Sequence, residues 1–446
     1  KNNKDYPRSV EYFQACAGGP GEYKNICSSR LADLYVQIKD RVNAKKYYKK
    51  VAYPSKRNSG SIYKGYARFQ LAQIDREDKK EKLLELNEKN FKKALDQRLR
   101  VLKSLTKGYK KAIDAGGPWG VAAMHEVALW VYQFSNEVND IPYSKENDPE
   151  GEKVFRSSLA AVSQPLLKDA LTRWKKAYQQ ALRLEIYSPA LPSIVDYLSD
   201  QKENIVTRAQ GAFGKYKLGG QFATKKTRAS SSDRKTLMNS LIKTPKESSK
   251  WVDYGNVLYL DGKPGLAQVC YKQAIALNKN NYNAQNNLAA FNLNKSGADN
   301  WYVASQSAYT FKSIIKKKNF FNLSKENRGK LLNYYRLFKK SKTEFEQLLV
   351  KDKQVVNVEG LAIALQGTGQ LDKSKTQFDL AIEEGLSTSK FSNRYNKAAR
   401  LSLNGKSGAE DCYDLLRKFD EEDFSGFELS SIQHLKRTCY QWMKKE

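Results

Sequence analysis

The sequence predicts an all-α protein in which antiparallel helix hairpins follow one another along the chain. Apolar residues recur at helical spacing over residues 24–53, where Leu31, Leu34 and Tyr35 fall on one helix face. Further amphipathic stretches cover residues 62–113, 119–134 and 165–189. Proline is scarce, at 11 of 446 residues, which favours long helices over a turn-rich β sandwich. With 40% apolar and 28% charged residues, the composition is that of a folded protein rather than a disordered one.

One basic segment interrupts the helical pattern. Residues 208–250 carry 11 Lys and Arg against 2 Asp and Glu, and they include runs rich in Gly, Ser and Thr. Such a composition predicts a linker or a loosely packed insertion. We therefore expect three parts: an N-terminal helical array over residues 1–207, the basic segment over 208–250, and a C-terminal helical array over 251–446.

A 34-residue motif indicates the kind of hairpin. In WVDYGNVLYLDGKPGLAQVCYKQAIALN, residues 251–278, large and small side chains alternate at fixed spacing. With Trp251 at position 4, the residues at positions 7, 8, 11, 20, 24 and 27 are Tyr254, Gly255, Leu258, Ala267, Tyr271 and Ala274. The same register fits Leu31, Ala32, Tyr35, Ala44 and Tyr48, and again Leu361, Ala362, Leu365, Ser374, Phe378 and Ala381. This pattern resembles the tetratricopeptide repeat, in which small residues at positions 8 and 20 let two helices approach closely.

The resemblance implies an α-solenoid of tetratricopeptide-like hairpins, wound into a right-handed superhelix with a concave groove lined by first helices. It also implies protein–protein recognition rather than catalysis. Some members hold an extended peptide with an Asn at position 9 of one repeat and an Asn at position 6 of the next. Those places are Asn256 and Asn287 here, with Tyr259 on the same face. An amide side chain can pair with both the N–H and the C=O of a bound backbone. The alternative is that these are ordinary polar surface residues.

Four of the five cysteines form two local pairs. Cys16 and Cys27 flank a turn-rich connection, and Cys412 and Cys439 lie on two expected helices at similar distances from the turn between them. That placement permits two disulfides and suggests an oxidising compartment. The alternative is that all five cysteines are small buried residues in a cytosolic protein. The first residues, KNNKDYPRSV, contain neither an initiator Met nor an apolar signal segment, so we expect a processed or trimmed chain.

Catalytic, cofactor and metal signatures are missing from the sequence. There is no phosphate-binding G-x4-G-K-[ST] motif, no Cys-x2-Cys pair, and only two His. His125 falls in an amphipathic helix and Cys270 on the packed face of a second helix, so both are expected to be structural. We therefore expect no enzyme, no cofactor and no metal site.

The net charge of +30 favours acidic partners or polyanions. The basic segment supplies the candidate contacts for a nucleic acid or an envelope polysaccharide: Lys215, Lys217, Lys225, Lys226, Arg228, Arg234 and Lys235. Because lysines are spread along the whole chain, the alternative is a generally solvated basic surface. No apolar run approaches the roughly 18 residues that would cross a bilayer.

Together these features predict a non-enzymatic scaffold that binds one or more protein or peptide partners in its groove. The paired cysteines favour a subunit of a bacterial cell-envelope assembly, periplasmic or otherwise exported. The alternatives are a cytosolic adaptor, and a protein that binds an anionic polymer through residues 208–250.

Overall fold

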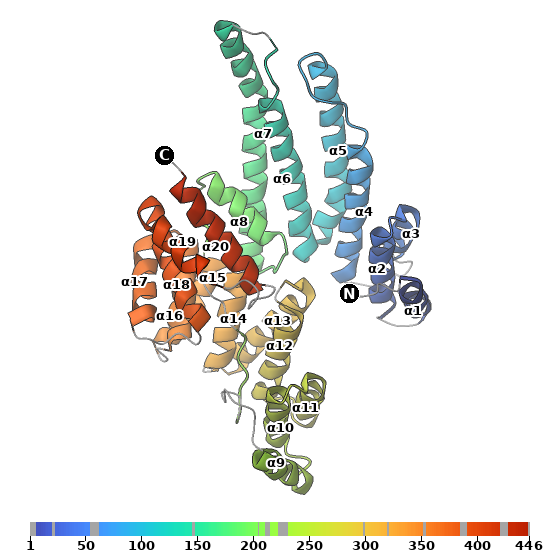
Figure 1. Ribbon diagram of the computed structural model, residues 1–446. Helices are drawn as coiled ribbons and strands as arrows, with labels where there is room; N and C mark the ends of the chain where they lie inside the picture. The colour runs from blue at the N-terminus through green and yellow to red at the C-terminus, as the bar shows by residue number, and fades with distance from the viewer. Residues whose placement is uncertain are drawn as a thin grey trace. The chain divides into compact units, whose positions relative to one another are not determined.

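The computed structural model is all-α, which confirms the fold class expected from the sequence (Figure 1). It describes residues 6–19, 23–53, 62–144, 148–203, 205–209, 215–221, 231–297, 299–318, 321–350, 354–383, 390–419 and 427–444. Within these ranges the regular elements are helices α1–α20 and one short 3-10 helix. The chain divides into two compact units, Lys1–Ile194 and Val195–Glu446, and the division falls inside one helix, α8.

The first unit is built from helix hairpins, with its longest helices in α5, α6 and α7. Its helices are α1 (Tyr6–Gly18), α2 (Tyr23–Gln37), α3 (Arg41–Ala52), α4 (Ile62–Lys80), α5 (Phe91–Ala115), α6 (Gly117–Asn139), α7 (Pro149–Leu184) and the start of α8 (Leu191–Asp200). Each helix from α1 to α6 packs against the next in sequence. Such nearest-neighbour packing is typical of repeat arrays, in which contacts are local along the chain.

The second unit continues the hairpin pattern with shorter helices. They are α9 (Ser231–Lys243), α10 (Ser248–Leu260), α11 (Pro264–Leu277), α12 (Tyr282–Ser296), α13 (Trp301–Lys317), α14 (Asn322–Tyr334), α15 (Phe338–Leu349), α16 (Val355–Gly367), α17 (Leu371–Glu383), α18 (Lys390–Ser402), the 3-10 helix Gly405–Gly408, α19 (Ala409–Arg417) and α20 (Phe427–Met443). The basic range 208–250 thus contributes α9, the start of α10 and the extended residues 215–221. Its predicted role as a boundary between two arrays stays a prediction.

Helix ends follow from local sequence. The side chain of Asn281 accepts a hydrogen bond from the Ala284 N–H at 3.0 Å, and Asn300 caps α13 in the same way. These caps satisfy N–H groups that the first turn of a helix leaves without a partner. Between α5 and α6, Gly116 has a φ of +69°, a conformation that glycine adopts without strain.

Close approach between the two helices of a hairpin is the feature that the repeat motif requires. A Cβ at Gly255 would lie 2.8 Å from Cε1 of Tyr271 and 3.1 Å from Cβ of Cys270, so α10 and α11 pack with no room for a side chain there. In later hairpins the small residue of the second helix is a serine that also bonds the first helix. Ser374 donates to the Ala362 carbonyl at 2.8 Å, and Ser341 donates to the Gly329 carbonyl at 3.0 Å.

The core consists of the large residues that the motif places between helices. Tyr48, Tyr271 and Phe378, at position 24 of the three best-matching repeats, are all fully buried. Cys270 is also buried, in a cluster with Tyr271 and Phe291, and burial raises the pKa of its thiol to about 11. The thiol is therefore protonated near neutral pH, which fits the structural role expected for it.

His125 lies in the core of the first unit. Its Nδ1 accepts a hydrogen bond from the Trp174 indole N–H at 2.9 Å, and both rings are buried between α6 and α7. Burial, aided by the nearby Arg76 guanidinium, lowers the pKa of His125 to about 4, so the ring is neutral near pH 7. This environment agrees with the structural role expected from the sequence.

Substituting Gly255 tests the close approach between α10 and α11. We expect Gly255→Ala to lower the free energy of unfolding of the second unit by about 1–3 kcal/mol, because the added methyl displaces the Tyr271 ring from a packed core. Thermal or urea unfolding monitored by circular dichroism measures the change.

Gly265, on α11 of the same hairpin, is the matched control. A Cβ there would meet no atom within 4 Å, so Gly265→Ala should be neutral or slightly stabilising through helix propensity. Equal losses for both variants would contradict the close-packing explanation.

Candidate functional site

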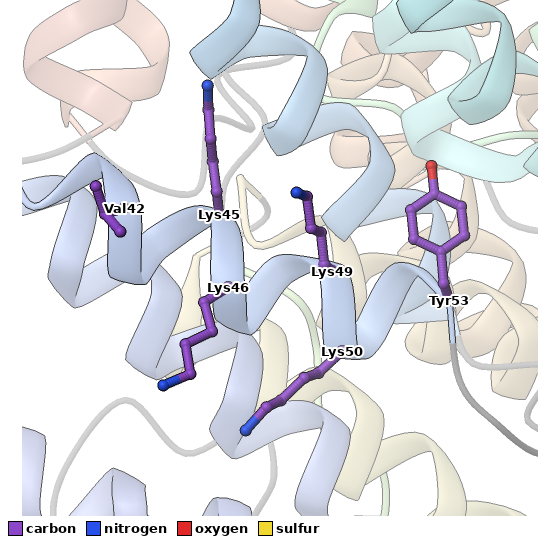
Figure 2. Close-up of a pocket in the computed structure, with 6 residues that line it drawn as sticks. All are labelled: Val42, Lys45, Lys46, Lys49, Lys50 and Tyr53. Atoms are coloured by element: carbon purple, nitrogen blue, oxygen red, sulfur yellow. The ribbon is translucent and has the colours of Figure 1, made fainter.

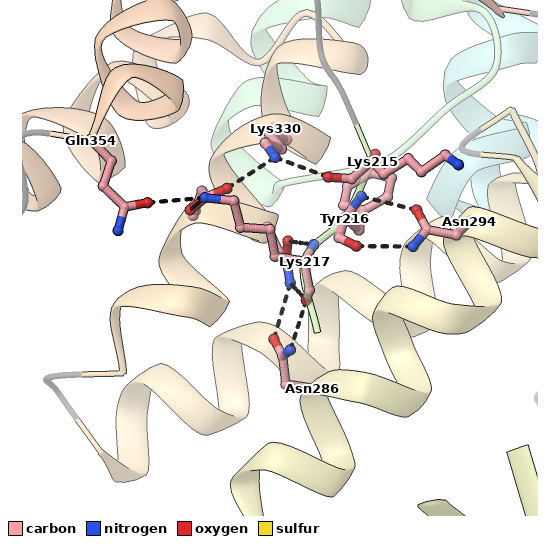
Figure 3. Close-up of polar contacts among 9 residues, drawn as sticks. Lys215, Tyr216, Lys217, Asn286, Asn294, Lys330 and Gln354 are labelled. Carbon is pink, nitrogen blue, oxygen red and sulfur yellow. Dashed lines mark hydrogen bonds and ion pairs between the residues drawn. The ribbon is translucent and has the colours of Figure 1, made fainter. Parts of the chain in front are cut away.

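The groove on the C-terminal array is occupied by a stretch of the same chain. Residues 215–221, called the groove segment below, run in an extended conformation across the first helices α10, α12 and α14 (Figure 3). In the part of the chain that the structure describes, the main chain of this segment makes its hydrogen bonds with side chains. The side chains of the groove therefore bond the segment through its main chain, as they would a bound peptide.

Two asparagines hold the segment at Gly219. The Asn287 side chain accepts from the Gly219 N–H at 2.7 Å and donates to the Gly219 C=O at 2.8 Å. Asn256 donates to the same C=O at 3.0 Å and to the Gln221 C=O at 2.9 Å. Both asparagines are fully buried. They lie where the repeat motif places residues that contact a bound backbone.

Further amides repeat this arrangement toward the start of the segment. Asn294 accepts from the Tyr216 N–H and donates to the Tyr216 C=O, both at 2.9 Å. Asn327 does the same at Lys217, at 2.7 and 2.8 Å, and Asn286 donates to the Lys217 C=O at 3.1 Å. Figure 3 shows Asn286 and Asn294 turned toward the segment from α12. One amide can thus satisfy both main-chain groups of one residue.

Charged side chains hold the two ends of the segment. The Lys330 ammonium donates to the Lys215 C=O at 3.0 Å, and the Asp253 carboxylate accepts from the Gln221 N–H at 2.9 Å. Charge-assisted hydrogen bonds of this kind are stronger than those between neutral groups. Main-chain contacts therefore span the segment from Lys215 to Gln221.

Hydrogen bonds behind the groove fix the orientation of the amides. The Tyr271 hydroxyl donates to Oδ1 of Asn256 at 2.9 Å, and Nδ2 of Asn287 donates to the same oxygen at 2.9 Å. The Ser324 hydroxyl donates to Oδ1 of Asn286 at 3.0 Å. With their oxygens occupied from behind, Asn256 and Asn286 present their NH₂ groups to the segment. These bonds orient the donors toward the segment backbone.

A buried acidic group recognises the lysine of the segment. The Lys217 ammonium lies 3.0 Å from Oε2 of Glu326, and the Lys330 ammonium lies 2.9 Å from the other oxygen. Burial lowers the pKa of Lys330. Behind them, burial raises the pKa of the Glu359 carboxyl to about 7, opposed by Lys330 and by a hydrogen bond from Asn396. This network favours a cation at the position of Lys217.

Steric limits select small residues further along the segment. A Cβ at Gly219 would lie 2.5 Å from Oδ1 of Asn283 and 2.8 Å from Cδ2 of Leu323. Gly220 has a φ of +97°, which favours glycine, and a Cβ there would lie 3.2 Å from the Asp253 carboxylate. The side chains of Tyr216 and Leu218 are both buried. The groove therefore fits a sequence of the type aromatic–Lys–apolar–Gly–Gly.

The groove segment does not fill the groove. A cleft of about 510 Å³ remains beside it, lined by Tyr216 and Leu218 of the segment and by Tyr259, Leu260 and Leu323 of the array. Tyr259 is half-buried, with its ring edge against Phe291 at a centroid distance of 5.9 Å. The groove therefore has open space beside the segment.

The site residues expected from sequence are brought together only in part. Asn256 and Asn287 lie side by side and contact the groove segment, and Tyr259 lines the adjoining cleft. Asn286, Asn294, Asn327, Glu326 and Lys330 were not predicted. One signal could have found Asn327. If Gly329 is set at position 8, Asn327 falls at position 6, as Asn287 does.

The basic residues expected to contact a polyanion have mixed environments. Lys217 and Arg234 are ion-paired, Arg234 with Asp261 at 2.8 Å, whereas Lys215 and Lys235 are exposed. Lys225, Lys226 and Arg228 lie outside the described residues. The polyanion contact stays a prediction, and two of its four described residues are paired with carboxylates of the chain itself.

A second hollow, of about 680 Å³, lies on the first unit along α3 (Figure 2). It is lined by Val42, Lys45, Lys46, Lys49, Lys50 and Tyr53. Lys45 is ion-paired with Asp75 and Asp78 of α4, at 3.0 and 2.7 Å. The hollow is thus a basic surface in which part of the charge is balanced within the protein.

Both predicted cysteine pairs are at disulfide distance. The Cα atoms of Cys16 and Cys27 are 5.8 Å apart, and those of Cys412 and Cys439 are 6.2 Å apart, with the sulfurs of each pair within bonding distance. Across the residues that the structure describes, no group of three His, Cys, Asp or Glu side chains could hold a metal ion. No described helix is long and apolar enough to span a membrane.

Comparisons with known proteins give likeness to solved structures alone. No protein-family model matches the chain, and no curated protein matches it. PilW, a type IV pilus biogenesis factor, is 15% identical over 45% of this chain and 88% of its own, with a TM-score of 0.33. A tetratricopeptide repeat protein from Parabacteroides merdae ATCC 43184 is 15% identical, over 56% of this chain and 97% of its own, with a TM-score of 0.33. The tetratricopeptide repeat domain of P58(IPK) is 11% identical, over 99% of this chain and 96% of its own, with a TM-score of 0.25.

Removing groove amides should release the segment. The double variant Asn287→Ala and Asn294→Ala deletes four hydrogen bonds to the segment backbone. At a net loss of about 2 kcal/mol or more, the released population should rise roughly thirtyfold. Limited trypsin digestion, with cleavage after Lys217 quantified by mass spectrometry, measures that population.

Asn292→Ala is the matched control on the same helix. Asn292 is half-buried and bonds Gln268 of α11 rather than the groove segment. Cleavage after Lys217 should be unchanged in this variant. A rate in the double variant equal to that of the wild type would show that the amides do not hold the segment.

Proposed function

We propose that this protein is a non-enzymatic scaffold whose C-terminal array binds an extended segment of a partner protein. The observation that carries the proposal is the row of asparagine side chains along α10, α12 and α14, which bond the main chain of Tyr216, Lys217, Gly219 and Gln221. Contacts to the main chain do not depend on the ligand being part of the same chain. The same groups can therefore bind a partner's backbone.

The orientation of the amides supports a binding role over a packing role. Burying asparagine costs free energy unless its hydrogen bonds are satisfied, and an apolar residue would pack these helices without that cost. Asn256 and Asn287 are fully buried and bond both each other and the groove segment. A second binding class, an anionic polymer on residues 208–250, has less support because Lys217 and Arg234 already have carboxylate partners.

We further propose that the scaffold works in an oxidising compartment, as part of a bacterial cell-envelope assembly. Two cysteine pairs at disulfide distance support this location over the cytosol, where thiols are kept reduced. Each pair joins neighbouring helices, α1 to α2 and α19 to α20, close to an end of the chain. A cross-link of this kind holds the two helices of a hairpin together.

Site-specific photo-crosslinking in the native host tests the groove. A benzoylphenylalanine in place of Tyr259 lies beside the groove segment and should form a discrete intermolecular adduct, identified by mass spectrometry. The adduct should weaken in the Asn287→Ala and Asn294→Ala background, because those amides would bind the partner's backbone.

Val269, exposed on α11, is the matched control for the same probe. An adduct of equal yield from position 269 would indicate chance collision rather than binding. Intramolecular products alone from position 259 would contradict a partner in the groove.

Thiol labelling tests the compartment separately. Protein from the native host is denatured without a reducing agent and then alkylated. We expect one alkylated cysteine, Cys270, because the other four are paired. After reduction, all five should react, and intact-mass spectrometry counts the adducts. Five alkylated thiols before reduction would contradict the two disulfides and the proposed compartment.

A further inference from the structure

We propose that residues 215–221 are a resident ligand of the groove, which a partner segment of the type aromatic–Lys–apolar–Gly–Gly displaces. This inference rests on the proposed function and deepens it by giving the sequence class of the partner segment. It also makes the groove self-blocking, since the chain supplies its own competitor. The support comes from the way the groove recognises individual side chains of the segment.

Lys217 is recognised by charge and by length. Its ammonium reaches 3.0 Å from Glu326, whose side chain is only 6% exposed, and 3.1 Å from Oε1 of Gln354 at the start of α16. A carboxylate deep in a groove favours a cation, and a shorter side chain from the same backbone position would not reach it. The partner must therefore carry a lysine, or an arginine of similar reach, at this position.

The glycine positions follow from space and conformation. Gly219 lies against the ends of the Asn283 and Leu323 side chains, which would have to shift to admit a Cβ, and Gly220 has a φ of +97°, which favours glycine. A β-branched residue at either position would force the backbone away from Asn287 and Asn256. Two glycines placed two and three residues after the lysine are thus the second element of the recognised sequence.

The segment shows the features of a ligand rather than of a core element. It forms no helix, and its main-chain contacts come from residues 32 to 115 positions later in the chain. Beside it, the open cleft along Tyr259 and Leu260 gives an incoming chain a place to bind before the segment leaves. A partner can therefore exchange with the segment without unfolding of the array.

Tethering sets how strongly the segment competes. A tethered ligand has an effective concentration on the order of millimolar. If the segment occupies the groove about 99% of the time, the apparent affinity of a partner peptide falls about a hundredfold. A variant that weakens binding of the segment to the groove should restore the higher affinity for the partner peptide. The difference in affinity then measures the self-blocking.

The test uses the full-length protein and a fluorescein-labelled peptide with the sequence of residues 215–221, KYKLGGQ, blocked at both ends. A release variant, Lys217→Glu with Gly219→Val, weakens the resident segment but leaves the helices of the groove unchanged. Fluorescence anisotropy should show the peptide binding the release variant at least about tenfold more tightly than the wild type. Adding Asn287→Ala and Asn294→Ala to the release variant should abolish binding.

Selectivity is tested with a control peptide carrying the same two replacements, Lys217→Glu and Gly219→Val. It should bind the release variant at least about tenfold more weakly than the unmodified peptide does. Equal binding of the two peptides would overturn the proposed sequence class. Equal binding of the unmodified peptide to wild type and release variant would overturn self-blocking.

A measurement on the wild type covers the case in which the release variant does not fold. With ¹⁵N-labelled protein, a large excess of unlabelled peptide should speed hydrogen exchange at the amides of Lys217, Gly219 and Gln221. Unchanged exchange at saturating peptide would overturn displacement. A wild-type dimer in solution that becomes monomeric in the release variant would show that the segment is exchanged between copies, and would overturn the intramolecular assignment.

The outcome separates this inference from the proposed function. One outcome is a partner captured at position 259 through a segment without the lysine and the two glycines. That result would support the scaffold function and contradict the proposed sequence class. Peptide exchange without any captured partner would support the proposed peptide recognition by the groove and contradict the scaffold function.

Discussion

Hydrogen bonds from asparagine side chains to an extended main chain are the interaction on which the C-terminal array depends. A helix uses its own main-chain groups internally, so a groove lined by helices can offer a bound backbone only side-chain partners. A buried N–H or C=O without a partner costs free energy, and each residue of an extended chain has both. One asparagine side chain can bond both the N–H and the C=O of a residue, as Asn287 does at Gly219 and Asn327 at Lys217.

The spacing of these amides follows from the packing of the hairpins behind them. Small residues such as Gly255 and Gly329 fix how closely the helices of a hairpin approach, and large ones such as Tyr271 and Phe345 fill the remaining space. Helix α14 contacts Lys217. Helices α12 and α10 both contact Gly219, and α10 also contacts Gln221. The consecutive residues Lys215, Tyr216 and Lys217 are also contacted, so the helices bond the main chain along most of the segment. Core packing and groove chemistry are therefore parts of one arrangement.

Local patterns predicted the helices well, and with them the positions that face the groove. Asn256 and Asn287 could be selected because their register was set by Trp251 and Tyr271, whose packing roles are visible in one repeat. Asn327 was missed because its helix carries Arg328 at position 7, where the motif has a large apolar residue. Asn294 lies near the end of its helix, at a position for which the motif has no preference.

The occupant of the groove was beyond prediction for a different reason. Residues 215–221 have no periodicity of their own, and their partners lie far along the chain, as Lys330 does for Lys215. The partner of Lys217 could not be predicted from net charge either, because a count of basic residues cannot show that Glu326 is buried opposite one of them. Pairing between distant groups is a property of the folded chain and not of composition.

A stretch that crosses three first helices also changes how the array holds together. In a solenoid each hairpin touches only its neighbours, so its ends can fray while the middle stays folded. The seven residues from Lys215 to Gln221 link α10, α12 and α14 to one common segment, over separations of up to 115 residues. These links convert a row of loosely dependent units into a single cooperative block. Emptying the groove would uncouple the repeats, so the mechanical stiffness of this half of the protein is set by whatever chain lies in it.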